Sequence, residues 1–209
     1  MKMSILKTGN FHTNCYIIKT SENNLVVIDP GDEGDKIKEI IDKTETKLAA
    51  ILLTHAHHDH TGAVKYLKEI YPEAPVYMGR EDEDMINNVY RNYACVRGKA
   101  MELFKDLRAD ILIDDGAEIK IDDLTFKAVA TPGHTKGGMT YICEDNMFTG
   151  DTLFYESIGR SDLYGGNSET ICQSVTKLML MEGDYKVFPG HGPSSTLDYE
   201  RQNNKYVRI

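Results

Sequence analysis

Residues 52–63, LLTHAHHDHTGA, place four of the chain's seven histidines and one aspartate within six consecutive positions. The stretch begins at the end of AAILLT, a continuous apolar run typical of a strand that is buried on both faces. Metal-binding side chains are held accurately where a rigid strand gives way to a loop. The histidines therefore belong either to a solvated polar loop or to one half of a metal site that the chain completes further along.

Three turns downstream offer the other half of such a site. They are ATPGHTKGG, FTGDTLF and FPGHGP, which contain His134, Asp151 and His191. Glycine beside each residue permits a tight turn that can direct a short side chain inward. One histidine in a Gly/Pro turn is usually only a polar loop residue. The combination with the dense cluster at residues 55–60 favours one shared site.

The number and type of these side chains indicate which metals would bind. Five histidines and two carboxylates exceed the about four ligands that a tetrahedral ion takes, and they suit two ions that share a carboxylate. Imidazole and carboxylate without thiolate favour Zn(II), with Fe or Mn as alternatives. The candidate ligands are His55, His57, Asp59, His60, His134, Asp151 and His191.

Hydrophobic periodicity predicts an α/β chain without an internal domain boundary. Apolar residues at helical spacing predict helices around residues 37–41, 63–70, 81–108 and 168–181, and a short one after Thr196. Short apolar or alternating runs predict strands at residues 14–18, 25–29, 49–54, 74–78, 111–113, 118–121, 124–130, 137–143, 147–151 and 185–192. Both halves of the chain follow a similar plan, which predicts two packed sheets with helices outside. For residues 81–108 the pattern favours core packing and leaves open a flap over the site.

Composition bears mainly on partners and location. A net charge of −9 would repel a phosphate backbone, so nucleic acid is not an expected partner. No apolar run reaches the roughly 20 residues that span a bilayer, and we see no secretory signal at the N-terminus. The four cysteines are widely spaced and are expected to be reduced, mostly buried thiols. These features predict a cytoplasmic protein that does not bind membranes.

The motifs together resemble those of the metallo-β-lactamase fold superfamily. THAHHDHTG is similar to its H-x-H-x-D-H motif, and PGHTKGG, GDTLF and PGHG match its later motifs in the right order. The resemblance covers the chain from about Asn14 onward and implies that residues 1–209 form one domain. The implied fold is an αββα four-layer sandwich, in which two mixed sheets pack face to face with helices outside.

The resemblance also implies a role for each candidate ligand. Asp29, in VVIDPGD, matches a position that supports the ligands by orienting a histidine N–H, although a plain Asp-Pro-Gly turn would explain it equally well. His58 and His12 fall outside the ligand positions. One ion would be held by His55, His57 and His134, and the other by Asp59, His60 and His191, with Asp151 bridging them.

Such a site predicts metal-assisted hydrolysis. Two ions about 3.5–4 Å apart can share a bridging water and lower its pKa toward roughly 7. Asp59 would orient the resulting hydroxide and accept a proton. Within the superfamily, GDTLFYESIGRSDLYGGN is similar to the glyoxalase II branch, which implies a small-molecule acyl-thioester substrate such as S-lactoylglutathione. Arg160 matches a basic residue that meets the glutathione carboxylate, with a salt bridge to Asp162 or a helix cap as the structural alternative.

Several alternatives stay open from the sequence. The glutathione-binding helical domain of full-length glyoxalase II enzymes and the tyrosine that they place behind the last metal histidine are both missing from this sequence. The chain therefore resembles the short, single-domain glyoxalase II-like hydrolases, and glutathione specificity is not implied. A persulfide dioxygenase with a single iron and a non-catalytic metal-binding protein are the remaining alternatives. The oligomeric state is left open.

Overall fold

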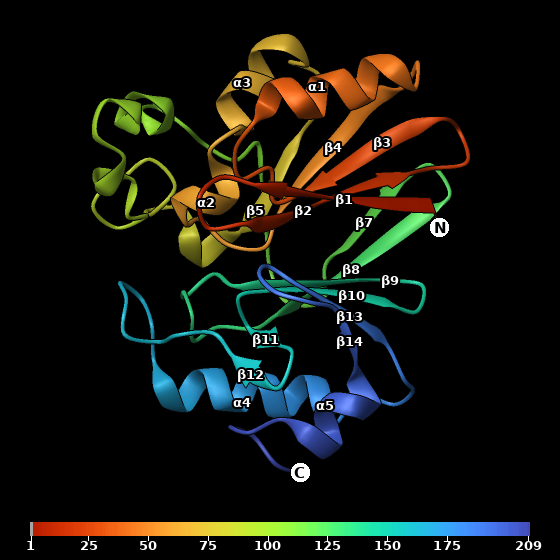
Figure 1. Cartoon of the computed structure of the whole chain (residues 1–209), viewed down its shortest axis with the longest axis vertical. Helices are drawn as coiled ribbons and strands as arrows, with labels where there is room; N and C mark the ends of the chain where they lie inside the picture. The colour runs from red at the N-terminus through yellow and green to blue at the C-terminus, as the bar shows by residue number, and fades with distance from the viewer. Residues whose placement is uncertain (1) are drawn as a thin grey trace.

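Two six-stranded sheets pack face to face in the computed structural model, which describes residues 2–209 and only the backbone of residues 99 and 100. Helices cover the outer face of each sheet, so that the layers follow one another as helix, sheet, sheet and helix (Figure 1). The predicted αββα sandwich is therefore confirmed.

The first sheet contains the strand that leads into the histidine cluster. In spatial order, the second strand is antiparallel to both of its neighbours, whereas the third to sixth strands are parallel to one another. In spatial order the strands are β1 (Lys2–Thr8), β2 (Thr13–Lys19), β3 (Asn24–Ile28), β4 (Lys47–Leu53), β5 (Val76–Gly79) and β6 (Ile111–Ile113).

The second sheet is built from the C-terminal half of the chain. It is antiparallel except for the pair β10 and β13. Its strands are, in spatial order, β14 (Ser195–Thr196), β13 (Lys186–Pro189), β10 (Asn146–Gly150), β9 (Met139–Cys143), β8 (Leu124–Ala130) and β7 (Glu118–Ile121). A separate small hairpin joins β11 (Leu153–Phe154) and β12 (Ser157–Ile158).

The position of β4 explains its continuous apolar sequence. Ala50 and Leu52 point into the core between the two sheets, whereas Ile51 and Leu53 point into the core beneath the helices. All four side chains are fully buried, because β4 is covered on both faces. This packing anchors the strand whose end carries the histidines.

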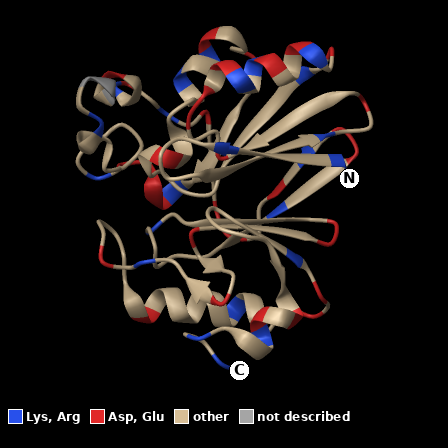
Figure 2. Ribbon diagram, viewed as in Figure 1, with Lys and Arg blue, Asp and Glu red and all other residues tan. Residues whose placement is uncertain are grey.

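The helices bury one hydrophobic face each and leave their charged residues outside. α1 (Gly34–Lys43) and α3 (Val64–Ile70) cover the first sheet, and α4 (Ser168–Met179) and α5 (Leu197–Asn203) cover the second. Lys, Arg, Asp and Glu lie mainly on these helices and on surface loops (Figure 2). In α4 the predicted inward residues Ile171, Val175 and Leu178 are buried, and Asn167 caps the helix by accepting a hydrogen bond from Thr170 N–H.

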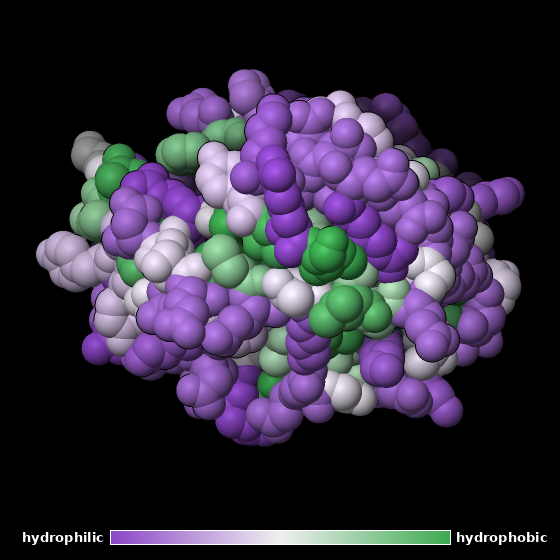
Figure 3. Space-filling model, turned by 90° about the horizontal axis from the view of Figure 1, so that it is seen from below, coloured by the Kyte–Doolittle hydropathy of each residue, from purple (hydrophilic) through white to green (hydrophobic). Residues whose placement is uncertain are grey.

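The outer side of α4 and α5 is mostly hydrophilic, with a small area of hydrophobic side chains near the centre of that face (Figure 3). Exposed hydrophobic residues of this part of the chain include Leu180, Tyr206 and Ile209. Among the described residues, no helix is both long and apolar enough to cross a membrane. Cys15 and Cys143 are buried, Cys95 and Cys172 are partly exposed, and all four are free thiols.

The predicted helix over residues 81–108 was wrong. The segment contains two 3₁₀ elements, η1 (Arg80–Asp82) and η2 (Ala94–Phe104), joined by turns. Gly98 interrupts η2 with φ 57° and ψ −124°, dihedrals that glycine adopts readily. The strand β1 and the small hairpin of β11 and β12 were also not predicted.

Asparagine side chains account for the missing helix. Asn88 Oδ1 accepts a hydrogen bond from Arg91 N–H at 3.3 Å, and Asn92 Oδ1 accepts one from Ala94 N–H at 2.9 Å. These local bonds compete with helical hydrogen bonding. The predicted core packing is nevertheless present, since several hydrophobic side chains of the segment are buried, namely Met85, Ile86, Phe104 and Leu107.

Candidate metal centre

The candidate ligands meet where several strands of the two sheets end. His55 follows β4, and His57 precedes the short helix α2 (His58–Thr61). Asp151 directly follows β10, His191 lies just beyond β13, and His134 stands in the loop between β8 and β9. The two sheets together thus bring residues from both halves of the chain to one place.

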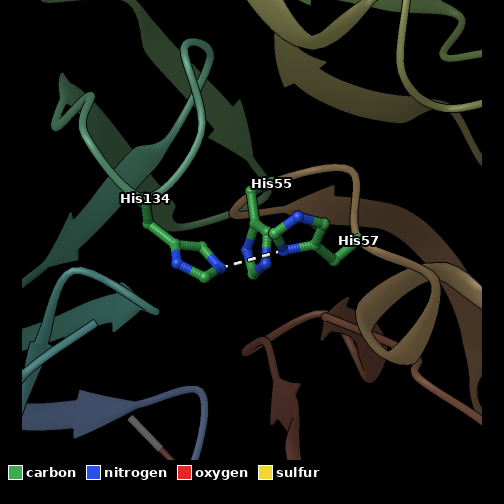
Figure 4. Close-up of side chains that lie close together, drawn as sticks. All are labelled: His55, His57 and His134. Atoms are coloured by element: carbon green, nitrogen blue, oxygen red, sulfur yellow. Dashed lines mark hydrogen bonds between the residues drawn. The ribbon is translucent and has the colours of Figure 1, made fainter. Parts of the chain in front are cut away.

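The first group consists of three histidines. His55, His57 and His134 are buried, and their ligand atoms lie within 4.8 Å of one another. Figure 4 shows the three imidazoles pointing toward one another from two separate segments, with His57 Nδ1 2.9 Å from His134 Nε2. Such a cluster of imidazole nitrogens can hold one metal ion.

The second group lies beside the first. Asp59, His60 and His191 also have ligand atoms within 4.8 Å of one another. His191 Nε2 is 3.3 Å from both His60 Nε2 and Asp59 Oδ2. Asp59 also accepts a hydrogen bond from the Thr13 hydroxyl at 3.3 Å. This group provides a second place for an ion.

Asp151 lies between the two groups. Its Oδ1 is 3.4 Å from His60 Nε2, and its Oδ2 is 3.5 Å from both His134 Nε2 and His191 Nε2. Gly190 packs against it so closely that an added Cβ would come within 2.2 Å of Asp151 Oδ1. The carboxylate therefore has the position of a bridging ligand.

Asp29 orients two of the histidines from outside the cluster. Its Oδ2 accepts a hydrogen bond from His60 Nδ1 at 2.9 Å and another from the Thr54 hydroxyl at 2.6 Å. Thr54 Oγ1 in turn lies 3.1 Å from His55 Nδ1, so a lone pair of the hydroxyl oxygen can accept a hydrogen bond from His55 Nδ1–H. Asp29 thus acts on His60 directly and on His55 through Thr54, beyond its place in an Asp-Pro-Gly turn.

Backbone carbonyls orient two further histidines. His134 Nδ1 donates to the carbonyl of Arg160 at 2.7 Å, and His191 Nδ1 donates to the carbonyl of Phe11 at 3.1 Å. Each bond holds a proton on Nδ1 and turns Nε2 toward the cluster, where Nε2 can bind an ion once it carries no proton.

The cluster fits divalent metal ions. Among the described residues, His55 Nε2 and Asp151 Oδ1 are buried without a hydrogen-bond partner, which is costly unless a metal satisfies them. Ligand atoms around a tetrahedral zinc lie roughly 3.4 Å apart, given Zn–N bonds of about 2.0–2.1 Å. The inter-ligand distances of 2.9–3.6 Å are close to that spacing.

Burial and charge divide the histidines into two kinds. Burial lowers the pKa of His55 well below its usual value, and burial together with His134 lowers that of His57 to about 3. For His191, burial is outweighed by Asp151 and Asp59, and the pKa rises to about 9. In the metal-free protein His55 and His57 are therefore neutral, whereas His191 carries a proton that metal binding must displace.

Asp82 is a supporting residue that sequence reasoning missed. The side chain is fully buried and accepts hydrogen bonds from Ala56 N–H at 3.0 Å, the Thr135 hydroxyl at 2.8 Å and Gly137 N–H at 2.7 Å. It thereby joins the loop that carries His55 and His57 to the loop that carries His134. In GREDED nothing but burial distinguishes Asp82 from its acidic neighbours.

We expect Asp82→Asn to loosen the first group of ligands. The amide would place an N–H group against a donor, which should lower the free energy of unfolding by about 1–3 kcal/mol. Metal affinity should fall by about 10- to 100-fold, as for other residues that support ligands. Denaturation and competition with a chelating dye measure the two effects. The exposed neighbour Glu81→Gln is the matched control, and unchanged metal affinity in Asp82→Asn would refute this role.

A cavity of about 540 Å³ opens onto the cluster and is bordered by Asp59, Asp151 and His191 among others. Arg160 also lines this cavity, yet its Nε and Nη2 each contact Asp162 at 2.7 Å. The salt bridge considered from the sequence is therefore present. His58 borders the cavity as well, with its ring between Phe11 and Phe104.

The sandwich and the paired ligand groups define a metalloprotein of the αββα class. The family model of the metallo-beta-lactamase superfamily matches residues 8–196. The chain belongs to the metallo-β-lactamase superfamily, as its motifs implied.

Curated relatives match the chain over almost its full length. The probable metallo-hydrolase YqgX of Bacillus subtilis is 33% identical over 99% of this chain and 98% of its own. The hydroxyacylglutathione hydrolase GloC of Haemophilus influenzae is 30% identical, with the same coverage of 99% and 98%.

Solved structures agree in fold. The B3 metallo-beta-lactamase BLEG-1 is similar with a TM-score of 0.91 and 30% identity, over 99% of both chains. TTHA1623, solved in a di-iron-bound form, has a TM-score of 0.82 and 32% identity, and the match covers 98% of this chain and 100% of that one. ETHE1 from Myxococcus xanthus has a TM-score of 0.83 and 25% identity, and the match covers 99% of this chain and 84% of that one. The superfamily fold is thus shared by proteins with different names.

Proposed function

We propose that the protein is a metal-dependent hydrolase that cleaves a small-molecule acyl thioester at a binuclear site. One observation carries this proposal. Asp151 contacts His134 of the first group and both His60 and His191 of the second, so two ligand groups share one carboxylate. Zn(II) is the proposed ion, with Fe or Mn as alternatives, since the ligands are imidazoles and carboxylates.

The reaction adds water to the thioester carbonyl. A C–O bond forms and the C–S bond breaks, which yields a carboxylic acid and a free thiol. When bound, the ions would supply an activated water and stabilise the negative charge that develops on the carbonyl oxygen.

Asp59 is the proposed proton acceptor. It borders the cavity, and its Oδ2 is held by the Thr13 hydroxyl and faces His191 Nε2 at 3.3 Å. In the metal-free protein the positive charges of His60 and His191 outweigh burial and lower the pKa of Asp59, and metal binding removes these charges by displacing the histidine protons. The Asp59 carboxylate can then orient a water molecule and take up the proton that this water loses.

The relatives support hydrolysis of this kind. GloC is named as a hydroxyacylglutathione hydrolase and YqgX as a probable metallo-hydrolase. Neither name decides the acyl group or the thiol of this chain's substrate.

The competing function is an oxidation at one iron. The second ligand group disfavours it, because an enzyme with a single ion has no evident use for Asp59, His60 and His191 gathered within 4.8 Å. A third possibility is metal binding without catalysis, which the open cavity beside the cluster disfavours.

Metal content and turnover, measured together, test the proposal. We expect about two ions per chain after reconstitution with Zn(II), Fe(II) or Mn(II), as a binuclear site requires. We also expect anaerobic release of free thiol from S-lactoylglutathione or S-acetyl-N-acetylcysteamine. One iron per chain with oxygen uptake would establish the oxidation instead, and full metal loading without thiol release would leave the binding role.

A further inference from the structure

The cavity next to the metal centre has hydrophobic walls. They come from three separate parts of the chain, namely the turn between β1 and β2, the η2 region, and the stretch that includes β11 and ends before α4. The floor is formed by the candidate ligands. The hydrophobic residues that line the cavity are Phe11, Tyr93, Val96, Phe154 and Leu163.

Two of these side chains are unusually exposed. Phe11 is 58% and Val96 68% exposed, although both line the cavity. They also border a neighbouring cavity of about 490 Å³, so they stand where the two hollows adjoin. Exposed hydrophobic groups beside a reactive centre gain free energy when an apolar group of a ligand covers them.

Positive charge is scarce on these walls. Arg160 is the one Lys or Arg among the described residues that line the cavity, and its guanidinium is already engaged by Asp162. Arg97 borders the neighbouring cavity and is likewise paired, with its Nη2 against Asp32. A ligand with several carboxylates would thus find few unpaired partners, whereas a hydrocarbon or aromatic group would find five hydrophobic side chains.

We infer that Phe11, Val96 and the facing hydrophobic walls hold the acyl group of the substrate. The preferred substrates are then thioesters of aliphatic or aromatic acids, rather than those of short hydroxy acids such as lactate. This inference rests on the proposed thioester hydrolysis and names the substrate class for that same site. Phe11 and Val96 act as specificity-determining residues.

A series of acyl thioesters of one thiol tests the inference. With acetyl, butyryl, hexanoyl and phenylacetyl esters of N-acetylcysteamine, we expect kcat/KM to rise about fourfold per added methylene until the cavity is filled. Phe11→Ser and Val96→Ser should each flatten this dependence on chain length. Tyr90→Ser is the matched control, because Tyr90 is 77% exposed in the same region and does not line the cavity.

The outcomes separate the inference from the proposed function. If no thioester releases thiol, including the acetyl ester, the proposed function fails. If all esters are cleaved at rates independent of acyl length, or the lactoyl ester of N-acetylcysteamine is cleaved faster than the hexanoyl ester, the acyl pocket is refuted while hydrolysis stands. The acyl pocket would also be refuted if Phe11→Ser or Val96→Ser lowered kcat/KM by the same factor for every ester and left its dependence on acyl chain length unchanged. Metal content measured for each variant excludes loss of the centre as the cause.

Discussion

Asp151→Ala is expected to lower the metal content from about two ions per chain to fewer than one, and to abolish thioester hydrolysis. Asp151 is the residue that contacts both ligand groups, so its removal weakens both ion positions together. The negative charges of Asp151, Asp59 and Asp29 outweigh burial and raise the pKa of His60. The loss of Asp151 removes one of these charges, so the pKa of His60 should fall. The loss of activity should exceed roughly 10³-fold, because the ions supply the nucleophile.

Metal analysis after gel filtration and initial rates measured with added Zn(II) check this result. Asp145→Ala is a suitable control, since Asp145 is exposed next to the start of β10 and pairs with Lys186 far from the cluster. A variant that keeps both ions and more than about one tenth of the activity would show that no bridging carboxylate is needed.

Asp59→Asn is expected to lower kcat by about 10²- to 10⁴-fold, with a smaller effect on KM. The amide keeps an oxygen that can still contact an ion, but it cannot accept the proton from water. The hydrogen bond that Asp59 Oδ2 accepts from the Thr13 hydroxyl can be retained by the amide oxygen, so the fold should change little.

Steady-state kinetics and metal content, measured on the same preparation, separate the two roles of Asp59. The exposed Asp35→Asn, at the start of α1, controls for the loss of one negative charge. Loss of the second ion in Asp59→Asn would assign the residue to metal binding alone, whereas full activity with both ions would remove it from the mechanism.

Local sequence patterns were enough to predict much of the fold. The strand at residues 49–54 was recognisable because a strand covered on both faces needs apolar residues at successive positions, as Ile51 and Leu52 illustrate. The hairpin of β2 and β3 followed from two short β-type runs on either side of a turn-rich connection, and the helix α4 followed from helical spacing. The strand β1 was missed because most of its side chains are exposed or only partly buried, which removes the alternation that marks a strand.

The candidate ligands were recognisable for a different reason. Metal sites need particular atoms, and few side chains provide them, so His55, His134 and His191 stand out even when they lie far apart in the chain. Residue type and turn context were therefore enough to select the set that the structure brings together.

The sequence alone thus indicated the layers of the fold and the atoms that gather at its centre, because hydrophobic periodicity and ligand chemistry are visible in local stretches. Only the tertiary structure distinguished Asp82 from the acidic residues around it, joined Asp29 to His60 and brought Phe11 and Val96 to the same cavity. Each of these depends on burial or on contacts between distant segments, and neither quantity is carried by the residues next to them in the chain.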